Sequence, residues 1–251
     1  EVLARVCRVP PLFASLPGSS QVISPDEIVD SPFNLRHSAG ALRTGYRSLG
    51  GMLDAMHRAL HAPAPPSYVY AYWPDFDHCA HKRGTGSDEA RALLCTLDEA
   101  LGQWVQSVAG CGALLLVTAD HGFIDAPPQR LIEIEDLPDL AACLTGPLSG
   151  ERRAVFCHVK PGQTGDFERA LQGLEHACVA WRSTELLDAG RFGPGPMHPQ
   201  LRERLGDYTL EMKADWTLRD TMPGERRHRL VGVHGGTSSD EMRVPLVCRE
   251  L

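Results

Sequence analysis

The sequence lacks any apolar run that approaches the roughly 20 residues of a membrane-spanning helix. It has no cluster of basic residues beyond short pairs such as Arg152–Arg153 and Arg226–Arg227, and its formal net charge is −7. The first residues, EVLARVCRVPPLF, lack the layout of a secretory signal, although a chain that begins with Glu leaves a preceding targeting segment open. We therefore expect a soluble protein with neither a membrane partner nor a nucleic-acid-binding surface.

The sequence also lacks a C-x-x-C pair. Its cysteines are scattered, and several of them lie inside apolar segments: Cys7, Cys79, Cys95, Cys111, Cys143, Cys157, Cys178 and Cys248. This pattern favours reduced, buried thiols over a disulfide framework. On this ground alone we expect a cytoplasmic location.

What is present is typical of an α/β fold. The chain has 251 residues, 43% of them hydrophobic, which is enough for one domain with a sizeable core. Apolar periodicity predicts alternating elements: strands at 21–25, 67–73, 112–118, 154–160, 207–214, 229–236 and 244–248, and helices at 46–62, from 88 to about 110, and 166–177.

Two features refine this prediction. The continuous apolar run 112–118 is typical of a strand buried on both faces of a parallel sheet, and with the strand at 67–73 and the helix between them it would form a βαβ unit. The Gly/Pro-rich loop at 192–199 indicates a small inserted subdomain around 125–215 within a single domain spanning 1–251.

Ligand-type residues follow three of the predicted strands. Asp77 and His81 follow the first, Asp120 and His121 the second, and His234 the last. Each group alone is typical of a turn or a helix cap. Because ligands bind beyond the carboxyl ends of strands in open α/β sheets, we expect the three groups to converge. Carboxylates mixed with imidazoles suit zinc and related divalent ions.

The spacing of these residues adds detail. Asp77 and His81 are four apart, so one helical turn after the strand would place both side chains on one face, and His234 would complete that set. Asp120 and His121 are adjacent, so the backbone must leave strand geometry for both to reach a metal. We expect Gly122 to permit this bend by adopting a positive φ.

The segments DFDHCAHKRG, TADHGF and HGGTSSDEMRVPL resemble the metal-binding motifs of the alkaline phosphatase superfamily, in particular its type I phosphodiesterase/nucleotide pyrophosphatase branch. The resemblance extends to the helix after GSDEA and to LGDYTLEMKADW, so it covers the chain from about Glu27 to its end. It implies a three-layer α/β sandwich with a mostly parallel central sheet.

The resemblance also implies two metal ions, zinc by preference, at the ~4 Å separation of two-metal sites. Asp77, His81 and His234 would hold one ion. Asp120 and His121 would hold the other. One ion would activate a Thr or Ser nucleophile and the other would stabilise the leaving oxygen, and water would then release a covalent phospho-enzyme.

The family places a further metal-binding aspartate and the nucleophile on a first strand and helix that precede the region of Glu27. We therefore expect this chain to be the C-terminal portion of the family domain, with the catalytic nucleophile upstream of it and unknown. Three functions stay open: a hydrolase of phosphodiesters or nucleotide pyrophosphates, a phosphomonoesterase or phosphate-transfer enzyme, and a non-catalytic metal-binding module. The substrate would be a small phosphate ester or nucleotide. The sequence does not indicate an oligomeric state.

Overall fold

The computed structural model describes residues 3, 9–222, 224–225 and 229–251, so Cys7 and the Arg226–Arg227 pair lie outside the described residues. The chain forms two compact units. The first comprises residues 1–78, 91–117 and 246–251, and the second comprises residues 79–90 and 118–245. The expected subdomain around 125–215 lies within the second unit, whereas the expectation of a single domain stays a prediction.

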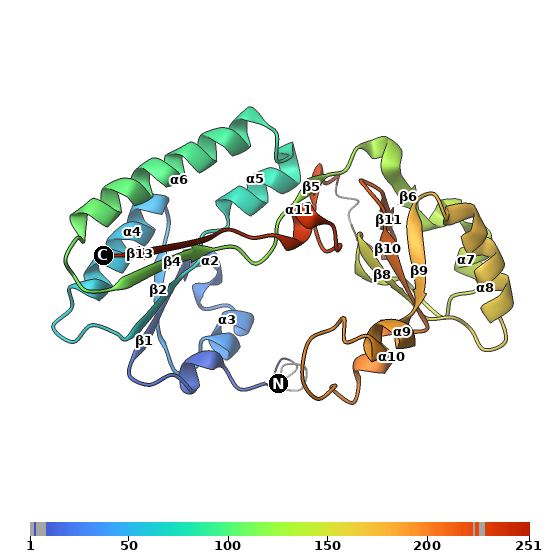
Figure 1. Cartoon of the computed structure of the whole chain (residues 1–251), viewed down its shortest axis with the longest axis horizontal. Coiled ribbons are helices and arrows are strands. Elements are labelled where there is room, and N and C mark those ends of the chain that lie inside the picture. Colours follow the sequence, from blue (N-terminus) through green and yellow to red (C-terminus); the bar gives the residue numbers. More distant parts are fainter. Residues whose placement is uncertain (1–2, 4–8, 223, 226–228) are drawn as a thin grey trace. The chain divides into compact units, whose positions relative to one another are not determined.

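The first unit contains a parallel sheet with the order β2-β1-β3. Figure 1 labels two of its strands, β1 and β2. Its strands are β1 (Ser20–Pro25), β2 (Leu42–Tyr46) and β3 (Tyr68–Ala71), and its longer helices are α4 (Leu49–Leu60) and α6 (Asp88–Ser107). Two short helices, α2 (Asp26–Val29) and α3 (Pro32–His37), follow β1. The sheet and the two long helices share one core, made of Ile23, Tyr46, Met52, Leu53, Ala55, Trp104 and Val108. The predicted elements at 21–25, 46–62, 67–73 and 88–110 are confirmed.

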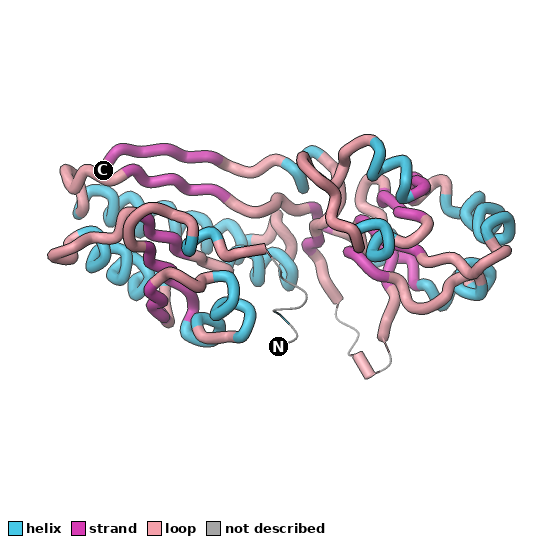
Figure 2. The backbone as a smooth tube through the Cα atoms, turned by 90° about the horizontal axis from the view of Figure 1, so that it is seen from below, coloured by secondary structure: helices cyan, strands magenta, loops and turns pink. Residues whose placement is uncertain are grey.

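A second pair of strands in this unit corrects two predictions. β4 (Leu114–Thr118) pairs with β13 (Leu246–Glu250) in a separate two-stranded sheet, and Figure 2 shows the two strands side by side. The expected βαβ unit is wrong, because β3 and β4 belong to different sheets. Burial on both faces is also wrong: Leu115 packs against the core, whereas Leu114 and Leu116 are 58% and 57% exposed. Among the described residues, no second layer covers that face.

The second unit is built on an antiparallel sheet with the order β7-β8-β10-β9. Its strands are β7 (Ser149–Glu151), β8 (Ala154–Cys157), β9 (Cys178–Arg182) and β10 (Tyr208–Met212), and its helices are α7 (Pro138–Ala142), α8 (Thr164–Leu171), α9 (Ser183–Asp188) and α10 (Leu201–Leu205). Residues including Leu140, Phe167 and Leu210 form its core. The predicted strand at 154–160 and helix at 166–177 are confirmed but shorter, because the strand ends at Cys157 and the helix continues only as a 3-10 turn over Gln172–Leu174.

Several short elements complete the described structure. β6 (Leu131–Glu133) pairs in parallel with β11 (Thr217–Arg219), and β5 (Ile124–Asp125) pairs antiparallel with β12 (Gly232–Val233). The strand predicted at 229–236 is therefore reduced to two residues. α5 (Asp75–Arg83) and α11 (Ser239–Met242) complete the set. No helix in the described ranges is both long and apolar enough to cross a membrane.

The described cysteines are free thiols. Three are buried (Cys143, Cys157 and Cys178), Cys79 is half-buried, and three are exposed (Cys95, Cys111 and Cys248). Burial raises the pKa of the Cys178 thiol to about 11, although nearby Lys213 opposes this shift. Because only a thiolate is an effective nucleophile, this thiol is unreactive in the folded chain.

The difference in burial between the cysteines predicts two classes of thiol reactivity. At pH 8, we expect iodoacetamide to modify the three exposed cysteines readily and the three buried ones only after denaturation. Peptide mass spectrometry over a time course, with and without urea, measures this. Modification of Cys178 in the folded protein at the rate of the exposed cysteines would contradict the burial described above.

Candidate metal centre

Helix α5 carries Asp77 and His81. It begins at Asp75, shortly after β3, so the two residues lie one turn apart, as their spacing predicts. The division between the two units falls within this helix, after His78, so His81 lies in the second unit. The C-terminal end of α5 is anchored there, since the Val231 N–H donates to the His81 carbonyl at 2.8 Å.

Backbone carbonyls orient two of the histidines. His81 Nδ1 lies 2.9 Å from the Gly232 carbonyl oxygen, and His121 Nδ1 lies 3.0 Å from that of Gly122. A carbonyl only accepts hydrogen bonds, so each Nδ1 must be the protonated donor. In both rings Nε2 is then the nitrogen that can ligate a metal, which is how most ligating histidines are held.

Three imidazoles surround the ring of Phe123. The ring centroids of His81, His121 and His234 each lie 5.1 Å from that of Phe123. His121 and His234 also stack on one another, with their centroids 3.6 Å apart and their planes inclined by 14°. The only signal for Phe123 in the sequence is its place as an aromatic residue directly after Asp-His-Gly, which did not predict this role. Phe123 provides an apolar surface against which the histidines are ordered.

A carboxylate oxygen of Asp77 and one ring nitrogen each of His121 and His234 lie within 4.8 Å of one another. Ligand atoms around a tetrahedral zinc ion are ~3.4 Å apart, as the usual bond lengths of 2.0–2.1 Å require, and this half-buried set could hold one ion if its side chains move slightly closer together. These three residues are a possible metal site. The structure thus groups His121 with Asp77 and His234, whereas the resemblance implied His81 in that place.

The two other predicted ligands lie beside this group. The His81 and His234 ring centroids are 5.2 Å apart. Asp120 Oδ1 lies 3.6 Å from His121 Nε2, and the Asp120 side chain is 78% exposed. Asp120 therefore faces solvent next to the histidines.

Gly122 has a different role from the one we expected. The predicted departure from strand geometry is confirmed, since β4 ends at Thr118. A positive φ at Gly122 is wrong, because Gly122 is not among the residues with that conformation. Glycine is needed for close approach instead: a Cβ at this position would overlap the carbonyl oxygen of Asp240, and the Gly122 N–H donates to the Glu241 carbonyl at 2.7 Å.

Alanine at position 122 is therefore expected to destabilise the chain by about 1–3 kcal/mol, because the backbone of α11 must move to admit a methyl group. Gly102 provides the matched control: it lies inside α6 with open space around its Cβ position. There, alanine should stabilise the chain by roughly 0.5–1 kcal/mol. Urea unfolding of both variants measures the two effects, and equal shifts of the same sign would contradict the steric explanation.

A buried ion pair joins Arg153 to Glu241, and Glu241 is hydrogen-bonded to the segments that follow His121 and His234. Arg153 and Glu241 are 1% and 2% exposed, and two hydrogen bonds of 3.0 and 2.9 Å join the guanidinium to the carboxylate. Burial alone would raise the pKa of Glu241, but hydrogen bonds from Arg153, Ser238 and the Gly236 N–H hold this pKa below its ordinary value. Glu241 is thus ionised at neutral pH. No pattern in the sequence predicted a role for either residue.

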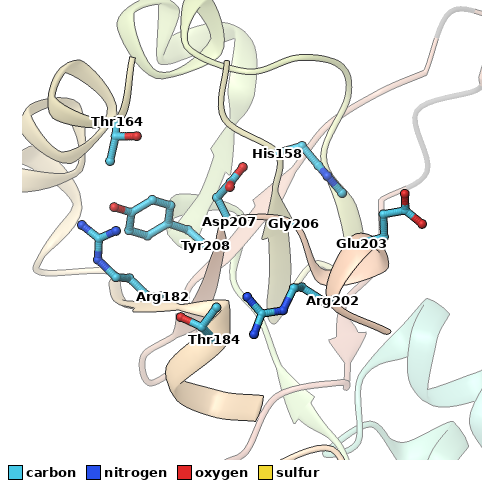
Figure 3. Close-up of a pocket in the computed structure, with 9 residues that line it drawn as sticks. All are labelled: His158, Thr164, Arg182, Thr184, Arg202, Glu203, Gly206, Asp207 and Tyr208. Atoms are coloured by element: carbon cyan, nitrogen blue, oxygen red, sulfur yellow. The ribbon is translucent and has the colours of Figure 1, made fainter. Parts of the chain in front are cut away.

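A separate cavity of about 330 Å³ also lies in the second unit; its lining residues are His158, Thr164, Arg182, Thr184, Arg202, Glu203, Gly206, Asp207 and Tyr208 (Figure 3). Within it the Arg182 guanidinium lies 5.3 Å from the centre of the Tyr208 ring. Arg182 forms an ion pair with Glu168, whose carboxylate also accepts a hydrogen bond from the Tyr208 hydroxyl. These polar groups already have partners, and none of the predicted metal ligands lines the cavity.

The site just described, a carboxylate with imidazoles on loops and a short helix of an α/β protein, is typical of metal-dependent hydrolytic proteins. The chain belongs to the type I phosphodiesterase/nucleotide pyrophosphatase family, whose model matches residues 12–237. No curated protein sequence matches it.

Solved structures confirm the α/β fold. Murine ectonucleotide pyrophosphatase/phosphodiesterase 5 matches with a TM-score of 0.71 and 16% identity over 94% of this chain, and the human protein of that name with 0.70 and 16% over 92%. The chain spans 61% and 60% of the lengths of these two proteins. Phosphonoacetate hydrolase from Sinorhizobium meliloti 1021, in complex with phosphonoformate, matches with a TM-score of 0.64 and 18% identity over 96% of this chain and 68% of its own. The fold is therefore alkaline-phosphatase-like.

Proposed function

We propose that the protein containing this chain hydrolyses phosphate esters, with phosphodiester or nucleotide pyrophosphate bonds as substrates, and that it uses two divalent metal ions, zinc by preference. Membership of the type I phosphodiesterase/nucleotide pyrophosphatase family supports the reaction class. The observation that carries the proposal is the approach of Asp77, His121 and His234 to within 4.8 Å of one another.

In this proposal Asp77, His81 and His234 hold one ion, and Asp120 and His121 hold the other. His121 lies between the two sets, because it stacks on His234 and lies near Asp120. Bound ions would neutralise charge on the phosphoryl oxygens and favour the ionised form of a coordinated hydroxyl. The chain itself holds the protons of His81 and His121 at Nδ1 through backbone carbonyls, and the Phe123 ring lies against all three imidazoles.

We place the nucleophile, a Thr or Ser, on a segment that precedes this chain in the whole protein. One solved structure of the murine relative is an inactive threonine-to-alanine variant in complex with AMP, which supports both a threonine nucleophile and a nucleotide ligand. The apolar faces of β3 and β4 support a further layer in the first unit, since Tyr70 and Leu116 are 44% and 57% exposed there.

The test compares the 251-residue chain with the product of the complete reading frame that encodes it. Both are stripped of metal, resupplied with Zn²⁺ or Mn²⁺, and assayed with bis(p-nitrophenyl) phosphate and p-nitrophenyl phosphate. We expect the complete protein to cleave the diester faster than the monoester and only with metal, and the 251-residue chain to bind metal with little turnover.

Each other outcome selects a different function. A preference for the monoester would favour the phosphomonoesterase. Metal binding without hydrolysis by the complete protein would favour the non-catalytic metal-binding module. Hydrolysis that persists without metal and without His234 would refute the proposed site.

We further propose a reducing location such as the cytoplasm and a small phosphate ester or nucleotide as the bound partner. The free thiols of the described cysteines support the first statement. The AMP bound to the murine relative supports the second.

A further inference from the structure

We propose that Glu241, together with Arg153, is a positioning residue that fixes the loop of His121 and the loop of His234 relative to one another. This inference rests on the proposed function, in which both histidines are metal ligands. Glu241 lies in the short helix α11, seven residues after His234, and contacts both loops through different groups.

The backbone of Glu241 holds the first loop. Its carbonyl oxygen accepts a hydrogen bond of 2.7 Å from the N–H of Gly122, the residue that directly follows His121. The contact is close, because Gly122 has no room for a Cβ against the neighbouring carbonyl of Asp240. The position of α11 therefore fixes the position of the backbone directly after His121.

The side chain of Glu241 holds the second loop. Oε1 accepts a hydrogen bond of 2.8 Å from the N–H of Gly236, and Oε2 accepts one of 2.6 Å from the hydroxyl of Ser238. A Cβ at Gly236 would lie 2.7 Å from Oε2, so the loop wraps closely around the carboxylate. Gly235, at φ +100°, provides the turn between His234 and this contact.

Arg153 fixes the carboxylate to the antiparallel sheet. It lies in the turn between β7 and β8, and its Nε and Nη2 donate to Oε1 and Oε2 of Glu241 at 3.0 and 2.9 Å. Its Nη1 donates to the Trp216 carbonyl at 2.6 Å, and its own carbonyl accepts from the Met212 N–H at 2.9 Å.

Buried ion pairs are often replaceable by apolar residues without loss of stability, so stability alone does not explain this one. The hydrogen bonds of Glu241 and Arg153 instead connect the loop of His121 and the loop of His234 to the antiparallel sheet. The stacking of His121 on His234, with ring centroids 3.6 Å apart, is the geometry that this connection maintains.

The experiment uses the 251-residue chain and the variants Glu241→Ala, Glu241→Gln and Leu210→Ala. The first readout is the NOE between the ring protons of His121 and His234 in metal-free protein. The second is the Zn²⁺ affinity, measured by competition with a chromophoric chelator, together with the Co²⁺ absorption spectrum. Leu210 is a fully buried core residue of β10, so its variant controls for lost stability without touching either loop.

We expect Glu241→Ala to lose the NOE, to bind Zn²⁺ about 10–100-fold more weakly and to change the Co²⁺ spectrum, as removal of a supporting residue does in other metal sites. Glu241→Gln keeps one oxygen acceptor and should show a smaller loss in each readout. Leu210→Ala should keep the wild-type NOE and affinity, although it unfolds at a lower temperature.

A wild-type NOE and affinity in Glu241→Ala, or equal losses in Leu210→Ala, would overturn the proposal. If Glu241→Ala does not fold, Glu241→Gln decides, and values identical to wild type would overturn it. If the wild-type chain binds no Zn²⁺, the metal part of the proposed function fails on its own. The NOE in metal-free protein still tests the positioning role in that case.

Discussion

Replacing His234 by alanine is expected to weaken Zn²⁺ binding by roughly 100-fold or more, because this removes a ligand itself rather than a residue that supports one. His234 belongs to the possible metal site and also stacks on His121, so its loss removes one donor and frees another ring. In the complete protein, hydrolysis of a phosphodiester should fall to background. Elemental analysis after gel filtration and chelator competition measure the binding.

His198 provides the control for this variant. It lies in the exposed loop at 192–199, where its Nδ1 accepts a hydrogen bond from the Gln200 N–H. His198→Ala should bind Zn²⁺ as the wild type does. Wild-type affinity in His234→Ala would remove His234 from the site, whereas a matching loss in His198→Ala would indicate adventitious binding to surface histidines.

Replacing Phe167 by alanine is expected to destabilise the second unit by about 3–5 kcal/mol, the usual cost of deleting a buried aromatic ring. Phe167 is fully buried in α8 and packs on Tyr208 of β10, with ring centroids 4.9 Å apart. Urea unfolding in a Trp73→Phe, Trp104→Phe background, followed by the fluorescence of the remaining Trp181 and Trp216 of this unit, measures the loss.

Phe192→Ala is the control, since Phe192 is 40% exposed and its ring lies edge-on to that of Phe156, with the centroids 6.4 Å apart. Its effect should stay within about 0.5 kcal/mol, as surface substitutions usually do. The two units can unfold separately, so the tryptophan signal and a global probe such as circular dichroism should be compared. A loss below about 1 kcal/mol in Phe167→Ala would contradict the core described for this unit.

Local patterns predicted the elements that depend on neighbouring residues alone. The spacing of Leu49, Met52, Leu53 and Met56 predicted α4, and the four-residue spacing of Asp77 and His81 predicted one face of the helix α5. The resemblance of the three motifs predicted the family and the fold, which the family match and the solved structures confirm. The assignment of ligands to two ions stays a prediction.

The features that the sequence did not predict depend on contacts between residues far apart in the chain. The apolar run Leu114–Thr118 predicted a strand but not its partner, because periodicity does not encode which strands share a sheet. Glycine at position 122 was predicted to provide backbone freedom. The structure shows that it is needed instead for a close contact with α11, more than 100 residues later in the chain. The role of Phe123 depends in the same way on His81 and His234, which are distant in sequence.

The sequence by itself therefore determined the α/β class and a set of candidate ligands, because residue type and local spacing are enough to predict both. These ligands are Asp77, His81, Asp120, His121 and His234. Only the tertiary structure decided that His121 lies with Asp77 and His234, and that Glu241 and Arg153 connect the two histidine loops. The physical reason is that hydrogen bonds such as that between Gly122 and Glu241 join residues whose separation in sequence carries no periodic signal, so they exist only once the chain has folded.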